Sequence, residues 1–234
     1  MATILNIETS TRVCSVSLSV NGEVVQLRET HTQNSHAEQV TLFCDEVIKN
    51  HNISFNDLDA VAVSKGPGSY TGLRIGVSTA KGLCYGLGIP LISVSTLEAM
   101  ALGIISETDK IEEKTLFCPM IDARRMEVYT SLFSEKMIEI EPITAKIIDD
   151  ESFSDYLSKN KIIFGGDGAP KCMEMLGGNA NAIFLNNFHT SATYVSKIAE
   201  DKFNRKIFED TAYFEPYYLK DFVAGIPKVK GLRM

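Results

Sequence analysis

The start of the chain alternates apolar and polar positions in the manner of β-strands. Residues 4–7 form a short apolar run, and residues 14–20 place their apolar side chains on one face of a predicted strand. Asn21 and Gly22, a pair typical of a tight hairpin turn, lead into the apolar run 24–27. The pattern therefore predicts three strands before any helix.

From residue 36 the apolar spacing changes to that of a helix. Residues 36–50 repeat apolar side chains every three or four positions, and Ser35 can cap this helix. The apolar run 60–63 predicts a strand, residues 72–86 a second helix, and residues 89–94 another strand. Strands and helices thus alternate, which indicates an α/β fold.

A polar stretch divides the chain near its middle. Ser95 and Glu98 form a capping box that starts a third helix. Residues 106–114 then interrupt the apolar pattern, so we place a domain boundary there. The prediction is an N-terminal subdomain of residues 1–106 and a C-terminal subdomain of residues 107–234 with a short basic tail.

The second half repeats the pattern of the first. Residues 7–18 align with residues 121–132, a shift of 114 positions, and each copy reads as strand, acidic turn and strand. A second echo pairs the strand 60–64 and its Gly-Pro-Gly loop with the strand 161–164 and the glycines after it. The repeat predicts a duplicated α/β unit, with acidic turns and glycine loops facing each other across a cleft.

Glycine and proline concentrate in one loop ahead of the second predicted helix. Gly66 and Gly68 can adopt positive φ, Pro67 fixes its own φ, and Ser69 or Thr71 can cap the helix. Backbone N–H groups would then converge on one point, which suits an anion or the backbone of a partner. The alternative is a tight connection between strand and helix that binds nothing.

The helix after this loop carries glycines on several faces. Gly72, Gly76 and Gly82 each cost up to about 1 kcal/mol relative to alanine, so we expect another backbone to approach this helix closely. The loop matches neither the Gly-x-x-x-x-Gly-Lys-Ser/Thr of a P-loop nor the Gly-x-Gly-x-x-Gly of a Rossmann fold. The sequence therefore argues against both a P-loop fold and a Rossmann fold.

The whole segment resembles the signature of a known family. Residues 66–76 and 80–83 are similar to the motif of the TsaB/TsaD family, whose members make threonylcarbamoyladenosine in tRNA. The resemblance implies a duplicated actin-like ATPase fold, of the kind found in sugar kinases and chaperone ATPases, with two mixed-sheet subdomains. The motif positions that we expect to matter are Gly66, Pro67, Gly68, Thr71, Gly72 and Arg74.

Histidine positions indicate which branch of the family fits. TsaD, the catalytic branch, is expected to be longer and to bind iron through a His-x-x-x-His pair on one helix face. In this chain His31, His36, His51 and His189 are the only histidines, and none is followed by histidine four residues later. The resemblance is therefore to the TsaB branch, and we expect no catalytic or metal-ligating residue.

Two other classes of function stay open. An autonomous small-molecule kinase of the actin-like fold would need tight binding of Mg-nucleotide, and a metallopeptidase would need bound metal. No Gly-x-Ser-x-Gly elbow occurs. The first acidic turn has Glu8 where the TsaB pattern usually has Asp, so we expect no metal there, and the alternative is a solvated Glu at a surface hairpin.

The TsaB resemblance implies a protein that binds others. It implies a non-catalytic subunit that binds TsaD and, with the ATPase TsaE, supports transfer of threonylcarbamoyl to the adenosine beside the anticodon. We expect the partner surface at Leu42, Ile75, Thr79 and Gly82, where helices pair with those of TsaD or of a second copy in a homodimer. No tightly bound cofactor is expected, although ATP or ADP at the partner interface stays open.

The second half holds further candidates. Arg124 and Arg125 lie in a segment that resembles the family's Asp-Ala-Arg-Arg-x-Glu-Val-Tyr, and they can meet phosphate or a partner carboxylate, or form a solvated charge cluster. The resemblance implies that residues 165–168 correspond to the glycine turn with which the actin-like fold approaches adenosine, a turn that looks degenerate in TsaB-like chains. Residues 215–220 resemble a C-terminal element of the family, and the basic stretch 225–233 can contact RNA or a partner, or stay solvated.

Composition limits the environment and the partners. The net charge of −7 argues against this chain holding a phosphate backbone alone, so tRNA contact is expected only through the complex. Five scattered cysteines without a Cys-x-x-Cys predict neither disulfides nor a zinc site. Without a signal-peptide pattern or an apolar run of about 18 residues, we expect a cytoplasmic protein with no membrane contact.

Overall fold

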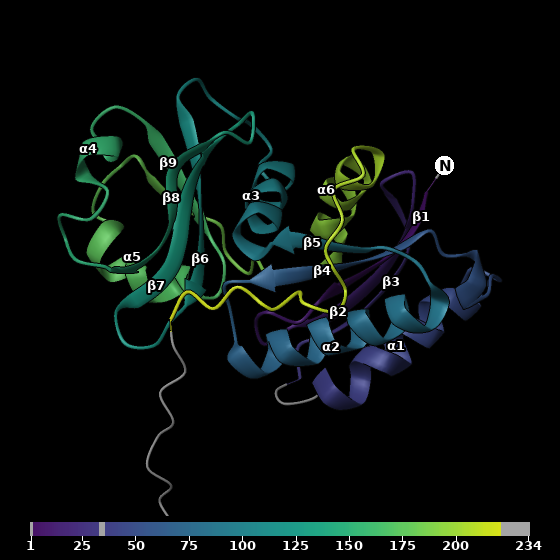
Figure 1. The fold of residues 1–234 in the computed structure, drawn as a ribbon. Helices are drawn as coiled ribbons and strands as arrows, with labels where there is room; N and C mark the ends of the chain where they lie inside the picture. The colour runs from purple at the N-terminus through teal and green to yellow at the C-terminus, as the bar shows by residue number, and fades with distance from the viewer. Residues whose placement is uncertain (1, 33–35, 221–234) are drawn as a thin grey trace, which may run out of the picture.

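The computed structural model describes residues 2–32 and 36–220. These residues form two five-stranded sheets, each covered by helices (Figure 1). The strand order is β3-β2-β1-β4-β5 in the first sheet and β10-β9-β6-β7-β8 in the second. In each sheet the first three strands of the unit are antiparallel and the last two join in parallel, which confirms the predicted α/β class with two mixed sheets.

The first unit contains each element that the sequence predicts before residue 106. The hairpin turn is confirmed, because Asn21 and Gly22 both adopt positive φ, 52° and 78°. Ser35, the predicted cap of the first helix, lies outside the described residues. The elements are β1 (Thr3–Glu8), β2 (Cys14–Val20), β3 (Glu23–Thr30), α1 (His36–Asn50), a short 3-10 helix (Phe55–Asp57), β4 (Ala60–Gly66), α2 (Tyr70–Leu87), β5 (Leu91–Ser95) and α3 (Thr96–Ser106).

The second unit repeats the order of strands and helices, with shorter helices after its third and fourth strands. Gly166 adopts φ +115°, close to the φ of +111° at Gly66 in the equivalent loop. The internal repeat predicted from sequence is therefore present in the fold. The elements are β6 (Thr115–Asp122), β7 (Glu127–Ser134), β8 (Glu139–Ile147), α4 (Ser154–Leu157), β9 (Lys161–Gly165), α5 (Ala169–Leu176), β10 (Ala182–Phe184) and α6 (Ala192–Asn204).

The last helix of each unit packs against the sheet of the other unit. Leu97 and Ile104 of α3 belong to a buried cluster with Phe117 and Ile163 of the second sheet, and α3 lies between the sheets (Figure 1). Val195 of α6 packs with residues of β1, β4 and β5 in the first sheet. The boundary at residue 106 stays a prediction, since the chain crosses back over it.

The packing of α6 on the first sheet covers the polar face of β2. The alternating pattern of residues 14–20 predicts apolar side chains on one face, and the polar side chains of Ser15, Ser17 and Ser19 on the other face are fully buried as well. Ser15 Oγ accepts the backbone N–H of Ala192 at 3.0 Å, and Ser17 Oγ donates to the Ala192 carbonyl at 3.1 Å. The second face is buried because α6, far along the chain, packs on it and satisfies the hydroxyls of Ser15 and Ser17.

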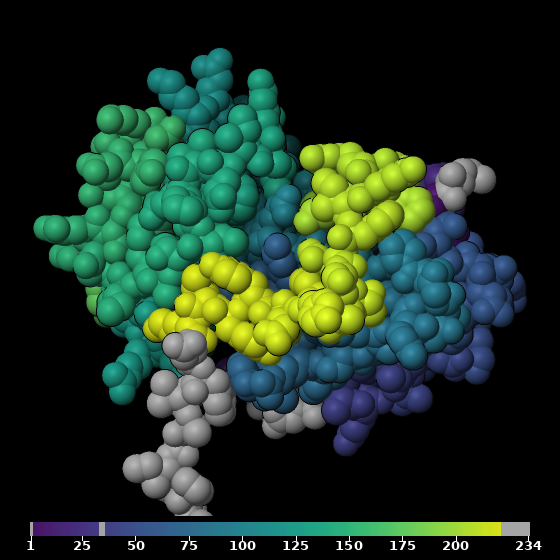
Figure 2. All heavy atoms as spheres, in the orientation of Figure 1, coloured from purple at the N-terminus to yellow at the C-terminus, as the bar shows by residue number. Residues whose placement is uncertain are grey.

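After α6 the chain returns over the first unit toward the second. We call residues 207–220 the C-terminal strap; it is the yellow segment that crosses the visible face in Figure 2. Lys81 Nζ of α2 donates to the carbonyls of Ala212 and Phe214 at 3.2 and 2.9 Å, and Tyr217 N donates to Lys65 O at 2.7 Å. The strap thus follows α2 along its length. None of the described helices has the length and hydropathy to cross a bilayer.

Candidate functional site

The signature loop departs from its predicted conformation at one of two glycines. Gly66 has the predicted positive φ of +111°, and a Cβ there would lie 2.6 Å from the Tyr217 carbonyl oxygen. Gly68 does not have positive φ, so that prediction is wrong. A Cβ at Gly68 would lie 2.3 Å from the Ser10 carbonyl oxygen, and glycine is required there because the backbone of the β1–β2 turn approaches directly.

Ser69 caps α2, whereas Thr71 is exposed within the first turn. Ser69 Oγ accepts the backbone N–H of Gly72 at 3.3 Å. The backbone N–H of Ser69 donates to the Ser10 carbonyl at 2.6 Å. One backbone donor that the sequence offered to an anion is therefore occupied by the chain itself.

The glycines of α2 seat this helix on the same turn. A Cβ at Gly72 would lie 2.1 Å from the Thr9 carbonyl oxygen, and one at Gly76 would lie 2.2 Å from Thr9 Oγ1. Thr9 Oγ1 donates to the Gly72 carbonyl at 2.8 Å. The expected close approach of another backbone is confirmed at Gly72, where it is the backbone of Thr9 in the β1–β2 turn, whereas at Gly76 the approaching group is the Thr9 side chain.

Glu8, at the end of β1, is buried beneath this contact. Its Oε1 accepts the Ser10 N–H at 2.6 Å, and its Oε2 accepts the hydroxyl of Ser64. Burial raises the pKa of the Glu8 carboxyl, although the hydrogen bonds from Ser10 and Ser64 oppose that shift. The interpretation of Glu8 as a solvated residue on a surface hairpin is wrong, since only 1% of it is exposed.

The equivalent turn of the second unit is open and charged. Asp122 pairs with Lys171 of α5 and accepts the Arg124 N–H at 2.9 Å. Partial burial works to raise the pKa of Asp122, but Lys171, the Arg124 N–H and the charge of Arg12 outweigh it and lower that pKa. The charge of Arg12, from the first turn, therefore acts on the acidic residue of the second turn.

The two candidate arginines lie at the tip of that turn. Arg124 and Arg125 both have positive φ, 71° and 50°, and both side chains are exposed. Neither guanidinium has a hydrogen-bond or salt-bridge partner among residues 2–32 and 36–220. Asp167, which follows β9, accepts the Asp122 N–H at 3.0 Å, and its pKa is raised by burial.

The described part of the chain places no three His, Cys, Asp or Glu side chains where they could hold a metal ion together. His36, at the start of α1, is buried, and its Nε2 lies 3.0 Å from the Thr11 carbonyl oxygen and 3.2 Å from that of Val13. These contacts indicate a structural role for His36, because they connect the start of α1 to the residues just before β2.

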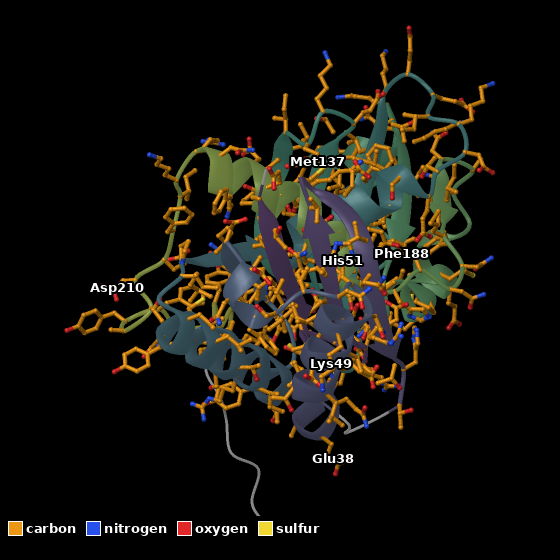
Figure 3. All side chains as sticks on the ribbon, turned by 90° about the vertical axis from the view of Figure 1, so that its right-hand side faces the viewer. Glu38, Lys49, His51, Met137, Phe188 and Asp210 are labelled. Atoms are coloured by element: carbon orange, nitrogen blue, oxygen red, sulfur yellow. The ribbon has the colours of Figure 1, made fainter. Side chains whose placement is uncertain are left out.

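The outer side of α1 and α2 carries the predicted partner residues. Leu42 is 54% exposed, Gly82 has open space where a Cβ would be, and Thr79 is half-buried. Ile75 is also half-buried, but it packs against the core of the first unit. Thr79 Oγ1 donates to the Ile75 carbonyl at 2.9 Å. Figure 3 views this side of the molecule at an angle, with Glu38 and Lys49 marking the two ends of α1.

Sequence reasoning missed two features next to this surface. Tyr85, one turn beyond Gly82, is 88% exposed, and only its helical spacing from Gly82 could have indicated it. The second feature is a stack in which Arg74 lies 4.2 Å from the centre of the Tyr70 ring while Arg74 Nε donates to Tyr218 Oη at 3.3 Å. No local pattern links Tyr218 to α2, because 144 residues separate it from Arg74.

The duplicated unit, the two sheets and the exchanged helices define the actin-like ATPase type of fold. Solved structures agree: YeaZ from Pseudomonas aeruginosa superposes with a TM-score of 0.78 at 22% identity, covering 94% of this chain and 100% of that one. An activator of 2-hydroxyisocaproyl-CoA dehydratase from Clostridium difficile gives 0.52 at 9% identity, over 89% and 98% of the two chains. At these identities the likeness concerns the fold alone.

Sequence comparison identifies the family. Residues 29–228 match the family described as TsaD, tRNA N6-adenosine threonylcarbamoyltransferase. The tRNA threonylcarbamoyladenosine biosynthesis protein TsaB of Haemophilus influenzae is 30% identical over 232 residues, which cover 94% of each chain. The chain belongs to the TsaB branch of this family, and membership supports a role in tRNA threonylcarbamoyladenosine biosynthesis.

Proposed function

We propose that this chain is a non-catalytic subunit that binds a TsaD-type protein through the outer side of α1 and α2. The observation that carries the proposal is the exposure of Leu42 (54%) and Tyr85 (88%) on helices whose other sides are buried in the core. Large apolar side chains exposed on neighbouring helices are typical of protein interfaces.

Small residues between these side chains favour helices as the partner elements. Gly82 has nothing within 4 Å of the place where a Cβ would be, and Thr79 lies three residues before it on the same side. Another helix can therefore approach closely at this point. Because the TsaD family description matches this chain over residues 29–228, a TsaD-type partner has the same fold and the equivalent pair of helices.

A four-helix interface follows from that symmetry. When the TsaD-type protein is absent, a second copy of this chain presents the same two helices, so the proposal includes a homodimer that competes with the heterodimer. One surface then serves both partners.

The closed signature loop supports the assignment of chemistry to the partner. Ser69 N donates to the Ser10 carbonyl, and Glu8 is occupied by Ser10 and Ser64, so these groups are engaged within the first unit. In this proposal TsaD transfers the threonylcarbamoyl group and contacts tRNA, TsaE supplies ATPase activity, and ATP or ADP binds only at the interface between subunits. The complex acts in the cytoplasm without a membrane.

The test places a long cation in the middle of the helical interface. Thr79→Arg should weaken both the homodimer and the complex with the cognate TsaD by about 100-fold or more, because the arginine cannot be desolvated in a close-packed contact. Analytical ultracentrifugation of the variant, alone and with TsaD, measures both equilibria. Circular dichroism and the melting temperature confirm that the monomer is folded.

The matched control is Met175→Arg on α5, an exposed position (42%) in the second unit that should leave both equilibria unchanged. An undiminished heterodimer in Thr79→Arg would contradict the proposed face and direct attention to the cleft between the units. ATP turnover by the purified chain alone would favour the kinase alternative, and one tightly bound metal per chain would favour the peptidase.

A further inference from the structure

A cavity lies where the two units meet the strap, on the face that Figure 2 shows hollowed between the second unit and α6. Its volume of about 370 Å³ falls within the range of roughly 300–1,000 Å³ that is usual for small-molecule sites. Its walls come from the end of β4, the start of α3, the β7–β8 hairpin and the strap. A ligand in this cavity would therefore contact both units at once.

One wall of the cavity is apolar and is backed by the core. Phe133 is buried in the cluster that α3 forms with the second sheet, and Met137 and Ile143 are half-buried against that cluster. An apolar group placed against these side chains is removed from water, which stabilises a complex in proportion to the area covered. The second unit therefore offers a surface for the apolar part of a ligand.

Two half-buried side chains of opposite charge lie on the first-unit side of the cavity. Lys65 is the penultimate residue of β4, and Glu98 lies in the first turn of α3. Within residues 2–32 and 36–220, neither side chain has a hydrogen-bond or salt-bridge partner. Because a charge withdrawn from water without a partner is unfavourable, a ligand that pairs with both groups gains free energy from each.

The other charges near the cavity are engaged within the chain. Glu139 accepts the hydroxyl of Ser131 at 3.2 Å, and Glu209 accepts that of Ser93 at 2.5 Å. Lys202, whose charge interacts with both members of the unpaired couple, donates to the Ser93 carbonyl at 2.7 Å. Counted over the described residues, two cations and three carboxylates nearly balance. The cavity therefore favours a ligand that carries one charge of each sign over a cation or an anion.

We propose that this cavity binds a free α-amino acid with an apolar side chain of about the size of leucine. Its carboxylate pairs with Lys65, its ammonium group pairs with Glu98, and its side chain lies against the apolar wall of the second unit. A free amino acid fits better than the end of a peptide, because it carries both charges on one carbon, whereas a peptide terminus carries one of them. The bound molecule links the units and stabilises the strap, since Tyr217 lines the cavity and its backbone N–H donates to the Lys65 carbonyl.

Ligand-detected NMR titration of the full-length protein with L-leucine tests the site. We expect saturable binding with a dissociation constant of about 1 mM or below. L-leucinamide lacks the carboxylate and isocaproate lacks the ammonium group, so each should bind at least about 10-fold more weakly than leucine. Failure of leucine to bind with a dissociation constant below about 10 mM overturns the proposal. So does tight binding of either analogue, because the site would then recognise a single charge.

Two variants assign the two charges of the ligand. Lys65→Met should weaken leucine binding about 10-fold and leave the weak binding of leucinamide unchanged, because leucinamide has no carboxylate to lose a partner. Glu98→Gln should weaken leucine binding to a similar extent and leave the binding of isocaproate unchanged. Undiminished leucine binding in both variants would place the amino acid elsewhere and overturn the proposal.

The matched controls are Lys136→Met and Glu135→Gln, which make the same changes at exposed positions of the turn between β7 and β8, outside the cavity. Both should leave leucine binding unchanged, and the melting temperature of each variant confirms that it is folded. The result is independent of the proposed partner surface, because Thr79→Arg should bind leucine as the parent protein does.

Discussion

The two units place aligned acidic residues in opposite environments. Glu8 ends β1 in the first unit and is fully buried, whereas Asp122 ends β6 in the second and is 38% exposed at its side chain. The first turn lies under a long helix, α2, of 18 residues, and the second lies beside α5, which has 8. The same duplicated strand pattern thus gives a sealed turn in one unit and an open one in the other.

Helix seating explains the difference. Gly68, Gly72 and Gly76 let α2 and the loop before it lie directly on Thr9 and Ser10. In the second unit Gly168 contacts the end of β6, but Lys171 of α5 reaches Asp122 as an ion pair at the surface. The first unit thus holds α2 directly against its β1–β2 turn, whereas the second unit exposes charged groups at the equivalent turn.

The largest change in stability should come from disrupting the close contact between the β1–β2 turn and the loop before α2. Gly68→Ala places a Cβ 2.3 Å from the Ser10 carbonyl oxygen, and the resulting displacement should lower the free energy of unfolding by roughly 3 kcal/mol. Gly82→Ala, the same change where the Cβ meets nothing within 4 Å, should instead raise it by up to about 1 kcal/mol. Urea unfolding measures both. Equal free energies of unfolding for the two variants would show that close packing at Gly68 and open space at Gly82 do not differ in their effect on stability.

A smaller effect should come from the buried carboxyl of the first turn. Because burial raises the pKa of Glu8 above 4.5, its folded form holds the proton more tightly than the unfolded chain does, and its contribution to stability falls as pH rises from 4.5 toward the folded pKa. Glu8→Gln keeps the acceptor for Ser10 and should abolish this dependence, which amounts to about 1.4 kcal/mol per unit of pKa displacement. Unfolding free energies of the two proteins between pH 4.5 and 8 give the comparison. Parallel pH profiles would mean that Glu8 is not the titrating group.

The smallest effect should come from the open turn, and it should have the opposite sign. The pKa of Asp122 is lowered below 3.8, so its ion pair stabilises the fold above that pH, and the contribution is lost as pH falls through the folded pKa. Since the pair is partly exposed and screened, Asp122→Asn should cost only about 0.5 kcal/mol at neutral pH. Thermal unfolding at pH 3 and pH 7 tests this, because the loss should be smaller at pH 3 than at pH 7. A loss as large as that of Gly68→Ala would show that the two turns are structurally equivalent.

Local patterns predicted the elements of the fold well. The bounds of α1, the hairpin turn at Asn21 and Gly22, and the Ser69 and Ser95 caps follow from spacing and from residue chemistry, and the structure confirms them. The repeat at a shift of 114 residues also predicted two similar units. These features depend on neighbours in the chain, so the sequence contains what is needed to predict them.

The candidate site was harder to predict, because its contacts join distant segments. The sequence indicated that Gly68, Gly72 and Gly76 need close approach, but not that Thr9 and Ser10 are the groups that approach. It left Glu8 as a solvated residue, although the hydroxyl of Ser64, 56 residues away, helps to bury it. Arg74 was likewise predicted only as a motif position, and the structure shows that it donates to Tyr218 of the strap.

The sequence by itself determined the family, the duplicated α/β pattern and the outward residues Leu42 and Gly82, since these depend on composition, spacing and helical periodicity. Only the tertiary structure decided that the signature loop closes on its own turn, that α3 and α6 exchange sheets and that the strap lies along α2. The physical reason is that burial and hydrogen-bond satisfaction are properties of the packed whole. A glycine or a buried serine shows in the sequence that something must approach, and the fold alone supplies what does.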